Sequence, residues 1–148
     1  MNHKWSQLRP LSKLDQLAET IMKSAFLLSE HHHVIQSYLN HYGAHFKVQN
    51  RVGEQEYKIF CSVEKTNYAF VSKKDLERGL RDDLWIGLVL FVDGEKPTKY
   101  LFPSTVWNEP NQLFTDSAVK NPEYGINLNQ YTMKDLVDQY AIERIIKK

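Results

Sequence analysis

The sequence lacks several features that would point to a class of protein. Its 148 residues include one cysteine, Cys61, which excludes a fold held by disulfides within the chain. The longest apolar stretch, Leu84–Val92, is far shorter than the roughly 20 residues that a membrane helix needs. No long apolar run follows the first charged residues, as it would in a secretory signal. We therefore expect a cytoplasmic protein that does not span a membrane.

The sequence also lacks an excess of charge of either sign. Nineteen Lys and Arg residues stand against eighteen Asp and Glu, which gives a net charge of +1. No overall electrostatic field draws such a chain to nucleic acid or to an acidic membrane, so any basic site must be local. The glycine-rich and nucleophile-elbow motifs of nucleotide-binding proteins, dinucleotide-binding proteins and α/β-hydrolases are absent as well.

What is present is the composition of an ordinary globular domain. The chain is 42% hydrophobic, 12% aromatic and 25% charged, and it shows no internal repeat. Its length suits one hydrophobic core rather than two. We expect a single domain over residues 1–148, with residues 1–10 as a flexible or loosely packed N-terminus.

Apolar residues at helical spacing predict a helix from Ser12 to near Ser29. A weaker repeat predicts a second, shorter helix over His33–Tyr42, which Gly43 is placed to end. A capping pattern at Ser72 predicts a short polar helix through Leu80, on the surface. The same pattern at Thr132 predicts a closing helix that packs onto the sheet.

Strand patterns fill the middle of the chain. Strands are predicted at Ala44–Gln49, Tyr57–Val63, Tyr68–Val71, Leu84–Val92, Lys99–Phe102 and Tyr124–Leu128. The nearly continuous apolar run of Leu84–Val92 favours a central strand that is covered on both faces. Most of residues 108–125 reads as an irregular loop. The prediction is an α+β fold with a central mixed β-sheet flanked by an N-terminal and a C-terminal helix.

Three segments carry a resemblance to a known family: Asp83–Gly87, Tyr100–Trp107 and Pro122–Leu128. In these segments the chain resembles the restriction-endonuclease-like, PD-(D/E)XK superfamily, and within it small uncharacterised bacterial domains. The resemblance spans roughly residues 11–141 in the order of elements. It implies a metal-dependent phosphodiesterase with a carboxylate on the first helix and an Asp ahead of the second core strand. On that strand an acidic residue or Gln stands two positions before a Lys.

The resemblance implies that two acidic groups hold Mg²⁺, which activates water, while the Lys orients that water. Glu19 on the first helix matches the first acidic position. In the direct alignment, Phe60 and Ser62 take the acidic and lysine positions, and neither has the required chemistry. Shifting the pattern gives Glu56 and Lys58 the E-x-K spacing, although this spacing is common by chance. The candidate catalytic residues are therefore Glu19, Glu56 and Lys58, with Glu19 and Glu56 as metal ligands if the domain is active.

The leading interpretation is a non-catalytic, nuclease-like domain that binds nucleic acid or a partner protein and needs no cofactor. The first alternative is an active Mg²⁺-dependent nuclease. The second is a structural protein that forms an oligomer, since the sequence does not determine the oligomeric state. Lys47 and Arg51 are candidate phosphate-binding residues, although acidic neighbours dilute their charge. Trp107 is a candidate for base stacking, and the alternative is that Trp107 and Phe114 close the core.

Histidines and the single cysteine complete the candidates. His31, His32 and His33 are consecutive, and His41 and His45 have the i, i+4 spacing of helical metal ligands. Because consecutive histidines point in different directions and Gly43 interrupts the other pair, we favour polar residues at a helix end. Metal binding or a pH-dependent contact is the alternative. Cys61 alternates with apolar residues, which favours a buried side chain over a nucleophile.

Overall fold

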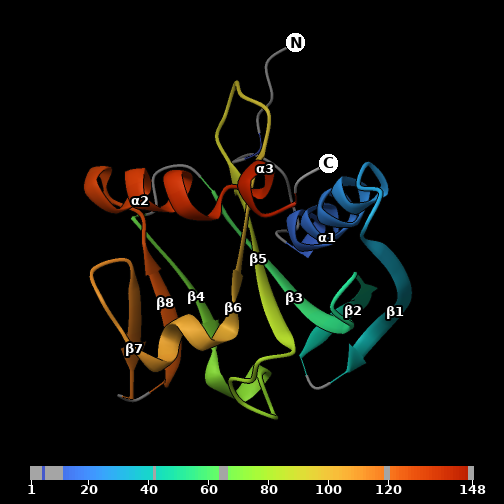
Figure 1. The fold of residues 1–148 in the computed structure, drawn as a ribbon. Coiled ribbons are helices and arrows are strands. Elements are labelled where there is room, and N and C mark those ends of the chain that lie inside the picture. The colour runs from blue at the N-terminus through green and yellow to red at the C-terminus, as the bar shows by residue number, and fades with distance from the viewer. Residues whose placement is uncertain (1–4, 6–11, 42, 64–66, 119–120, 147–148) are drawn as a thin grey trace.

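The described part of the chain forms two packed β-sheets and three α-helices (Figure 1). The computed structural model describes residues 5, 12–41, 43–63, 67–118 and 121–146. The helices are α1 (Ser12–Leu27), α2 (Gln130–Tyr140) and α3 (Ile142–Ile145), with 3-10 turns η2 (Lys73–Asp75) and η3 (Ser104–Asn108). This is the predicted α+β fold, with a mixed sheet between an N-terminal and a C-terminal helix.

Five strands form the larger sheet, in the order β1-β2-β3-β5-β6, and three form the smaller one, in the order β4-β8-β7. The larger sheet contains β1 (His33–His41), β2 (Ala44–Gln49), β3 (Glu54–Val63), β5 (Leu84–Phe91) and β6 (Thr98–Pro103). The smaller sheet contains β4 (Tyr68–Ser72), β7 (Phe114–Ser117) and β8 (Glu123–Asn127). All neighbouring strands are antiparallel except β3 and β5, which run parallel from the pair Glu56 and Leu84 to the pair Val63 and Phe91.

Helix α1 covers one face of the larger sheet because its apolar residues recur every four positions. Leu14, Ala18, Met22 and Phe26 are fully buried against Phe46, Val48, Tyr57 and Ile59. Gly87 of β5 allows this close approach, since a Cβ atom there would lie 2.6 Å from Ile59 Cδ1 and 2.9 Å from Met22 Cε. Strand β5 is therefore the central, doubly covered strand that its apolar run predicts.

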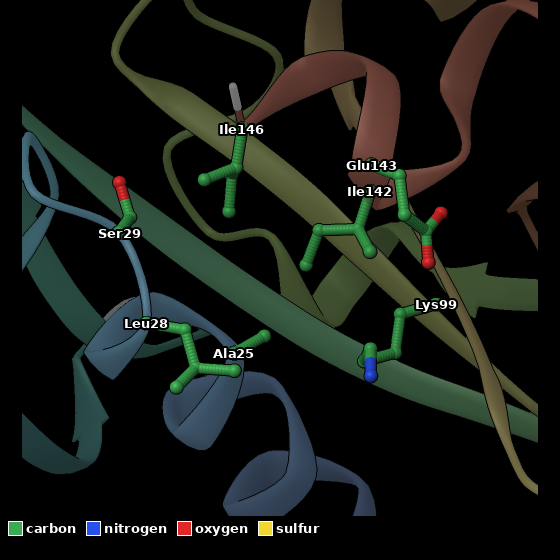
Figure 2. Close-up of a pocket in the computed structure, with 7 residues that line it drawn as sticks. All are labelled: Ala25, Leu28, Ser29, Lys99, Ile142, Glu143 and Ile146. Atoms are coloured by element: carbon green, nitrogen blue, oxygen red, sulfur yellow. The ribbon is translucent and has the colours of Figure 1, made fainter. Parts of the chain in front are cut away.

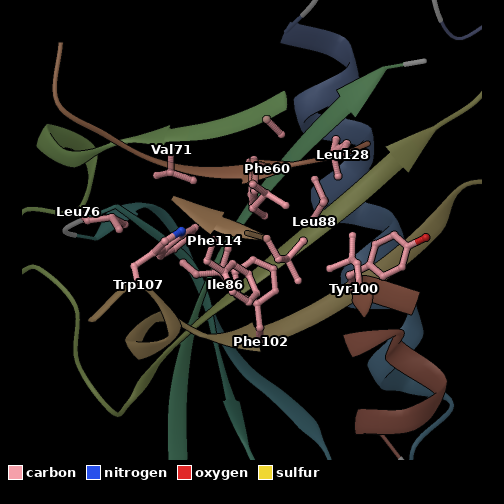
Figure 3. Close-up of a cluster of buried hydrophobic side chains, with 14 of the residues drawn as sticks. Phe60, Val71, Leu76, Ile86, Leu88, Tyr100, Phe102, Trp107, Phe114 and Leu128 are labelled. Carbon is pink, nitrogen blue, oxygen red and sulfur yellow. The ribbon is translucent and has the colours of Figure 1, made fainter. Parts of the chain in front are cut away.

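The smaller sheet covers part of the opposite face and forms a second core with it (Figure 3). Figure 3 shows Phe60 and Leu88 of the larger sheet packed with Val71 of β4 and with Leu128, which directly follows β8. Strand β7 lies in the segment predicted to be irregular. The side chain of Asn111 accepts hydrogen bonds from the N–H groups of Leu113 and Phe114, which turns the chain into this strand.

The predicted helix over His33–Tyr42 is wrong, because this segment is β1, paired antiparallel with β2. Its apolar residues include Val34, Ile35 and Tyr38, which are β-branched or aromatic and favour a strand. Gly43 adopts a φ of 92° in the tight turn between β1 and β2, so it serves a hairpin rather than a helix end.

Two other helix predictions need correction. The predicted polar helix after Ser72 shortens to η2, and Leu76 behind it is 3% exposed and part of the core. The closing helix is present but begins one turn earlier. Asn129 is its N-cap, and Thr132, predicted as the cap, is the third helical residue of the capping box.

The prediction for residues 1–10 lies outside the described residues except for Trp5. The Trp5 ring lies 5.1 Å from the ring of Phe91, centroid to centroid, and Trp5 Nε1 donates a hydrogen bond to the carbonyl oxygen of Glu95 at 3.1 Å. Over the described ranges, no helix has the length and apolar character to cross a membrane.

Candidate functional site

The polar residues of β2 and β3 lie on the face of the larger sheet opposite α1. Because side chains alternate along a strand, burial of Phe46 and Tyr57 under α1 turns their neighbours toward the opposite face. The smaller sheet covers that face at Phe60, which belongs to the second core. The part before Phe60 is the candidate site. We call it the polar sheet face, and it comprises Tyr38, Lys47, Glu54, Glu56 and Lys58.

Glu56 is buried and ion-paired. It is 6% exposed, and Arg81 Nη2 donates a hydrogen bond to its Oε1 at 2.8 Å. The other arm of the guanidinium, Nη1, donates to Asp83 Oδ1 at 2.7 Å. Burial lowers the pKa of Arg81, but the two carboxylates outweigh burial and raise it. A guanidinium cation thus bridges the two carboxylates that could otherwise share a divalent cation.

The main chain around Arg81 is fixed as well. Ser104 is fully buried; its Oγ donates to the Arg81 carbonyl oxygen at 2.8 Å and accepts the Arg81 N–H at 3.1 Å. The N–H of Glu56 donates to the carbonyl oxygen of Asp83 at 2.7 Å, where the parallel pairing of β3 and β5 begins. These contacts hold Arg81 and Glu56 together through the backbone as well as through their side chains.

Tyr38 and Lys47 extend the network across β1 and β2. Burial raises the pKa of Tyr38, and so do a hydrogen bond to Glu56 and the charge of Glu56. The negative charge of an ionised Tyr38 and a hydrogen bond to Glu54 raise the pKa of Lys47, whose Nζ lies 3.4 Å from Glu54 Oε1. The candidate phosphate-binding residue Lys47 is therefore engaged within the chain.

Arg51 lies in the turn between β2 and β3. Its Nη2 is 2.9 Å from His31 Nε2, which places the guanidinium against the loop that follows α1. The structure does not bring Lys47 and Arg51 to a common contact, so these two residues do not form a continuous basic patch by themselves.

Lys58 interacts with different residues from Glu56. Burial lowers the pKa of Lys58, and the charges of Asp75 and Asp15 oppose this shift. Although Glu56 and Lys58 share a face of β3, no ion pair joins them within the described ranges. The E-x-K spacing therefore does not produce an E-x-K contact.

His45 fills the point where β2 and β3 separate. Its Nδ1 accepts a hydrogen bond from the N–H of Ile59 at 2.8 Å, which replaces the next bond of the strand ladder. Burial and then the charge of Lys58 lower the pKa of His45 to about 4. The ring is therefore a neutral acceptor at neutral pH, and its contact is structural.

Glu19 does not join the other two candidate catalytic residues. It pairs with Lys23 on α1 at 2.8 Å, and α1 lies on the face of the sheet opposite Glu56. Among the residues with a described position, no group of three or more His, Cys, Asp or Glu side chains could hold a metal ion. Glu19 and Glu56 thus belong to opposite faces of the larger sheet.

The histidines around the start of β1 have separate partners. His31 contacts Arg51, and His32 Nδ1 lies 2.8 Å from Ser29 Oγ. The side chain of His41 lies outside the described residues. The contact of His32 with Ser29 lies within the loop after α1, and the contact of His31 with Arg51 ties that loop to the turn between β2 and β3.

Cys61 lies against α1 with its Sγ 3.4 Å from Asp15 Oδ1. Burial, together with the charge of Asp15, raises the pKa of the thiol to about 12. A thiol that stays protonated at neutral pH is a poor nucleophile, which supports the interpretation of Cys61 as a packing residue.

Trp107 closes the second core. It is 1% exposed, its Nε1 donates to the Gly125 carbonyl oxygen at 2.9 Å, and its ring packs edge-on against Phe102 and Phe114. No face of the indole is left for a base, so the alternative prediction, in which Trp107 and Phe114 close the core, describes this residue.

Sequence reasoning did not identify Arg81 and Tyr38 as partners of Glu56, or Asp83 and Ser104 as partners of Arg81. The available signal was the Arg81-Asp82-Asp83 run directly before the central strand. Its use requires knowing that β5 pairs parallel with β3, which spacing does not reveal.

Comparison with known proteins gives no relative. No family model matches the chain, and no curated protein or solved structure is significantly similar to it.

Proposed function

We propose that the chain is a non-catalytic binding domain on a restriction-endonuclease-like scaffold, and that it binds a partner protein. The order of a helix, three antiparallel strands and a strand parallel to the third supports this scaffold. So does the position of Glu56 and Lys58 on one face of β3. The observation that supports a partner protein is three exposed apolar side chains, which lie at the end of α1 and in the turn between β2 and β3. The contact of Arg51 with His31 connects these two segments.

The ion pairs of Arg81 support the proposal that the domain lacks metal-dependent catalysis. A Mg²⁺ ion needs carboxylate oxygens that are free to coordinate it. Here Glu56 and Asp83 are both held by the guanidinium of Arg81, at 2.8 Å and 2.7 Å. An ion would have to displace an internal cation that the backbone also fixes, which disfavours the active-nuclease alternative.

The apolar corner consists of Leu27, Leu28 and Val52, which are 79%, 74% and 90% exposed. The two leucines stand at the end of α1, and Val52 lies in the turn between β2 and β3. The contact of Arg51 with His31 ties that turn to the loop after α1. Grouped, exposed, large apolar side chains are typical of surfaces that bind proteins.

A pocket of about 240 Å³ adjoins this corner (Figure 2). Ala25 and Leu28 form one wall, and Ile142 and Ile146 face them across the opening from α3 and its end. A pocket of this size would accept one apolar anchor side chain of a partner, and such anchors carry much of the binding energy of protein interfaces.

Nucleic acid is the less favoured ligand. Phosphate binding depends on basic side chains whose charge is available. Arg81 is paired with acidic residues, Lys47 with Glu54, and the net charge of the chain is +1. The apolar corner is therefore the better-supported binding surface.

Affinity capture with quantitative mass spectrometry tests the partner. The double variant Leu28→Ser/Val52→Ser should lose about tenfold or more of any protein that the wild-type chain retains. Val137→Ser, another exposed valine at 42% exposure but on α2, is the matched control and should retain it. Equal retention by the wild-type chain and both variants would refute the proposal that the apolar corner binds the partner. A wild-type dimer that the double variant converts to a monomer would identify the partner as a second copy.

Incubation with plasmid DNA and RNA in the presence of Mg²⁺ or Mn²⁺ tests the absence of catalysis. We expect no cleavage by the wild-type chain. Cleavage that both Glu56→Ala and Lys58→Ala abolish would establish the active-nuclease alternative instead.

A further inference from the structure

The outer face of the smaller sheet carries two aromatic rings. Tyr68 and Phe70 alternate along β4 with Ala69 and Val71, which are buried in the second core. The rings are inclined by 22° with centroids 6.2 Å apart, and Phe70 is 54% exposed. Two nearly parallel rings, one of them largely open to solvent, thus stand on the side of the sheet away from the core.

Gly125 of β8 lets the ring of Tyr68 lie across the sheet. A Cβ atom at Gly125 would be 1.9 Å from Tyr68 Oη, so no other residue fits beneath this ring. The hydroxyl donates to Glu123 Oε1 at 3.1 Å and lies 3.4 Å from Thr115 Oγ1 on β7. The ring therefore spans from β4 to β7 and is held in place at its far end.

Glu123 supplies a negative charge beside these rings. It stands on β8 two residues before Gly125, on the same outer face, and is partly exposed. In the described part of the chain, the side chain of Glu123 has the Tyr68 hydroxyl as a partner and no basic residue. Aromatic faces and a carboxylate that has no counter-ion among the described residues are thus combined on one surface.

We propose that this surface binds an arginine side chain on an extended segment of the partner protein. The proposal rests on the proposed function in so far as the partner supplies the arginine. A guanidinium stacks on aromatic rings by cation–π attraction, and its fork of N–H groups matches a carboxylate. The rings of Phe70 and Tyr68 would receive the flat face, and Glu123 would accept the hydrogen bonds.

The chain holds one of its own cations in the same way nearby. Lys73, directly after β4, lies with its Nζ 4.8 Å from the ring centroid of Tyr124 and is ion-paired with Asp116. The pair formed by Tyr124 and Asp116 is therefore already occupied by a lysine of the chain itself. The pair formed by Phe70 and Glu123 has the same chemistry and is open to a cation from outside.

Other ligands fit this surface less well. The charge of Glu123 would repel a phosphate group, which disfavours single-stranded nucleic acid despite the aromatic rings. A purely apolar partner would bury the carboxylate of Glu123 without a partner, at a cost in binding energy. Charge complementarity therefore selects a cation, and the flat rings favour arginine over lysine.

An NMR titration of the ¹⁵N-labelled full chain tests the proposal. The probe is the blocked peptide acetyl-Gly-Ser-Arg-Ser-Gly-amide, compared with peptides that carry lysine or the neutral isostere citrulline in place of arginine. We expect amide shifts centred on Phe70, Glu123 and Gly125, and an affinity for the arginine peptide about tenfold above that for citrulline. Equal affinities for arginine and citrulline, or shifts elsewhere on the chain, would overturn the proposal.

Variants of the surface sharpen the test. Phe70→Ala should weaken binding about fivefold and Phe70→Trp should restore it, since the stacking face returns. Glu123→Gln should weaken binding about tenfold, while the control Glu109→Gln, at an exposed glutamate after η3, should not. If these variants change nothing while the apolar corner still governs partner capture, this proposal fails and the proposed function stands. If the apolar corner does not affect partner capture and the arginine peptide binds as expected, the proposed function fails and the arginine-binding surface stands.

Discussion

One face of β3 meets two different environments along its length. In the first half, Glu56 and Lys58 lie outside the area that the smaller sheet covers, and charged side chains of the chain itself surround them. In the second half, Phe60 lies under the smaller sheet in a dry core. Guanidinium and carboxylate groups fill the first, uncovered half, and apolar packing fills the second, covered half.

The difference shows that a side chain can be buried by an ion pair as well as by apolar packing. Glu56 is 6% exposed, and Arg81 reaches it from the segment before β5. The ion pair with Arg81 leaves Oε1 of Glu56 engaged within the chain. Substitutions in the two halves should therefore have different signatures.

The largest expected effect is in the covered half. Phe60→Ala removes a buried ring and should lower the free energy of unfolding by about 3–5 kcal/mol. Phe70→Ala, on the exposed face of the smaller sheet, is the matched control and should change it by less than about 1 kcal/mol. Urea denaturation followed by circular dichroism measures both. Equal losses would mean that Phe60 is not part of a packed core.

His45 stands at the boundary between the halves and should make stability depend on pH. Its folded pKa of about 4 lies below the ordinary value of 6.5, so between these values the unfolded chain binds a proton that the folded chain does not. Stability should be independent of this group above pH 6.5 and fall by up to about 3 kcal/mol as the pH drops to 4.

His45→Asn checks this assignment, because its amide oxygen offers an acceptor to the Ile59 N–H without titrating. Urea denaturation between pH 4 and 7 should show a flatter profile for His45→Asn than for the wild type. His33→Gln, at an exposed histidine on β1, should keep the wild-type profile. A steep fall that persists in His45→Asn would assign the pH dependence to other groups.

In the uncovered half, Arg81→Ala should cost about 2–3 kcal/mol, because it leaves the carboxylate of Glu56 buried without its cation. The partial exposure of Arg81, at 19% of its side chain, keeps this below the cost for a fully buried pair. The double variant Arg81→Ala/Glu56→Gln should recover part of the loss, since no buried charge remains. A double variant less stable than Arg81→Ala would show that Arg81 acts by packing alone.

The smallest effect is expected on α1. Glu19→Gln removes a partly exposed i, i+4 ion pair with Lys23 and should change the free energy of unfolding by about 0.5 kcal/mol or less. Thermal and urea denaturation should place this variant within error of the wild type. A loss comparable to that of Arg81→Ala would connect Glu19 to the polar sheet face after all.

Much of the fold was predictable because local pattern and tertiary environment agree. The four-residue spacing from Leu14 to Phe26 matches one helix face, and the apolar run of β5 matches a strand covered on both sides. Strand β1 was not predictable as a strand, because its apolar residues fit both periods. Only its pairing with β2 across the turn at Gly43 decides between them. Strand β7 depends likewise on β8, which follows later in the chain.

The candidate site was predictable in its residue types and not in its contacts. Alternation along β3 placed Glu56 and Lys58 on one face, and alternation along β2 placed Lys47 there too. The partner of Glu56 is 25 residues away along the chain, in a segment without a regular pattern. Trp107 shows the converse, since a residue that resembles a surface aromatic in the sequence is buried by elements on either side of it.

The most direct test of the account is an isothermal titration of Mn²⁺ into the wild-type chain and into Glu56→Gln. Because Arg81 already neutralises Glu56, we expect the two titrations to be indistinguishable, with no saturable site that depends on this carboxylate. A one-to-one site in the wild type that Glu56→Gln abolishes would show that a metal ion displaces Arg81, and would contradict the central claim.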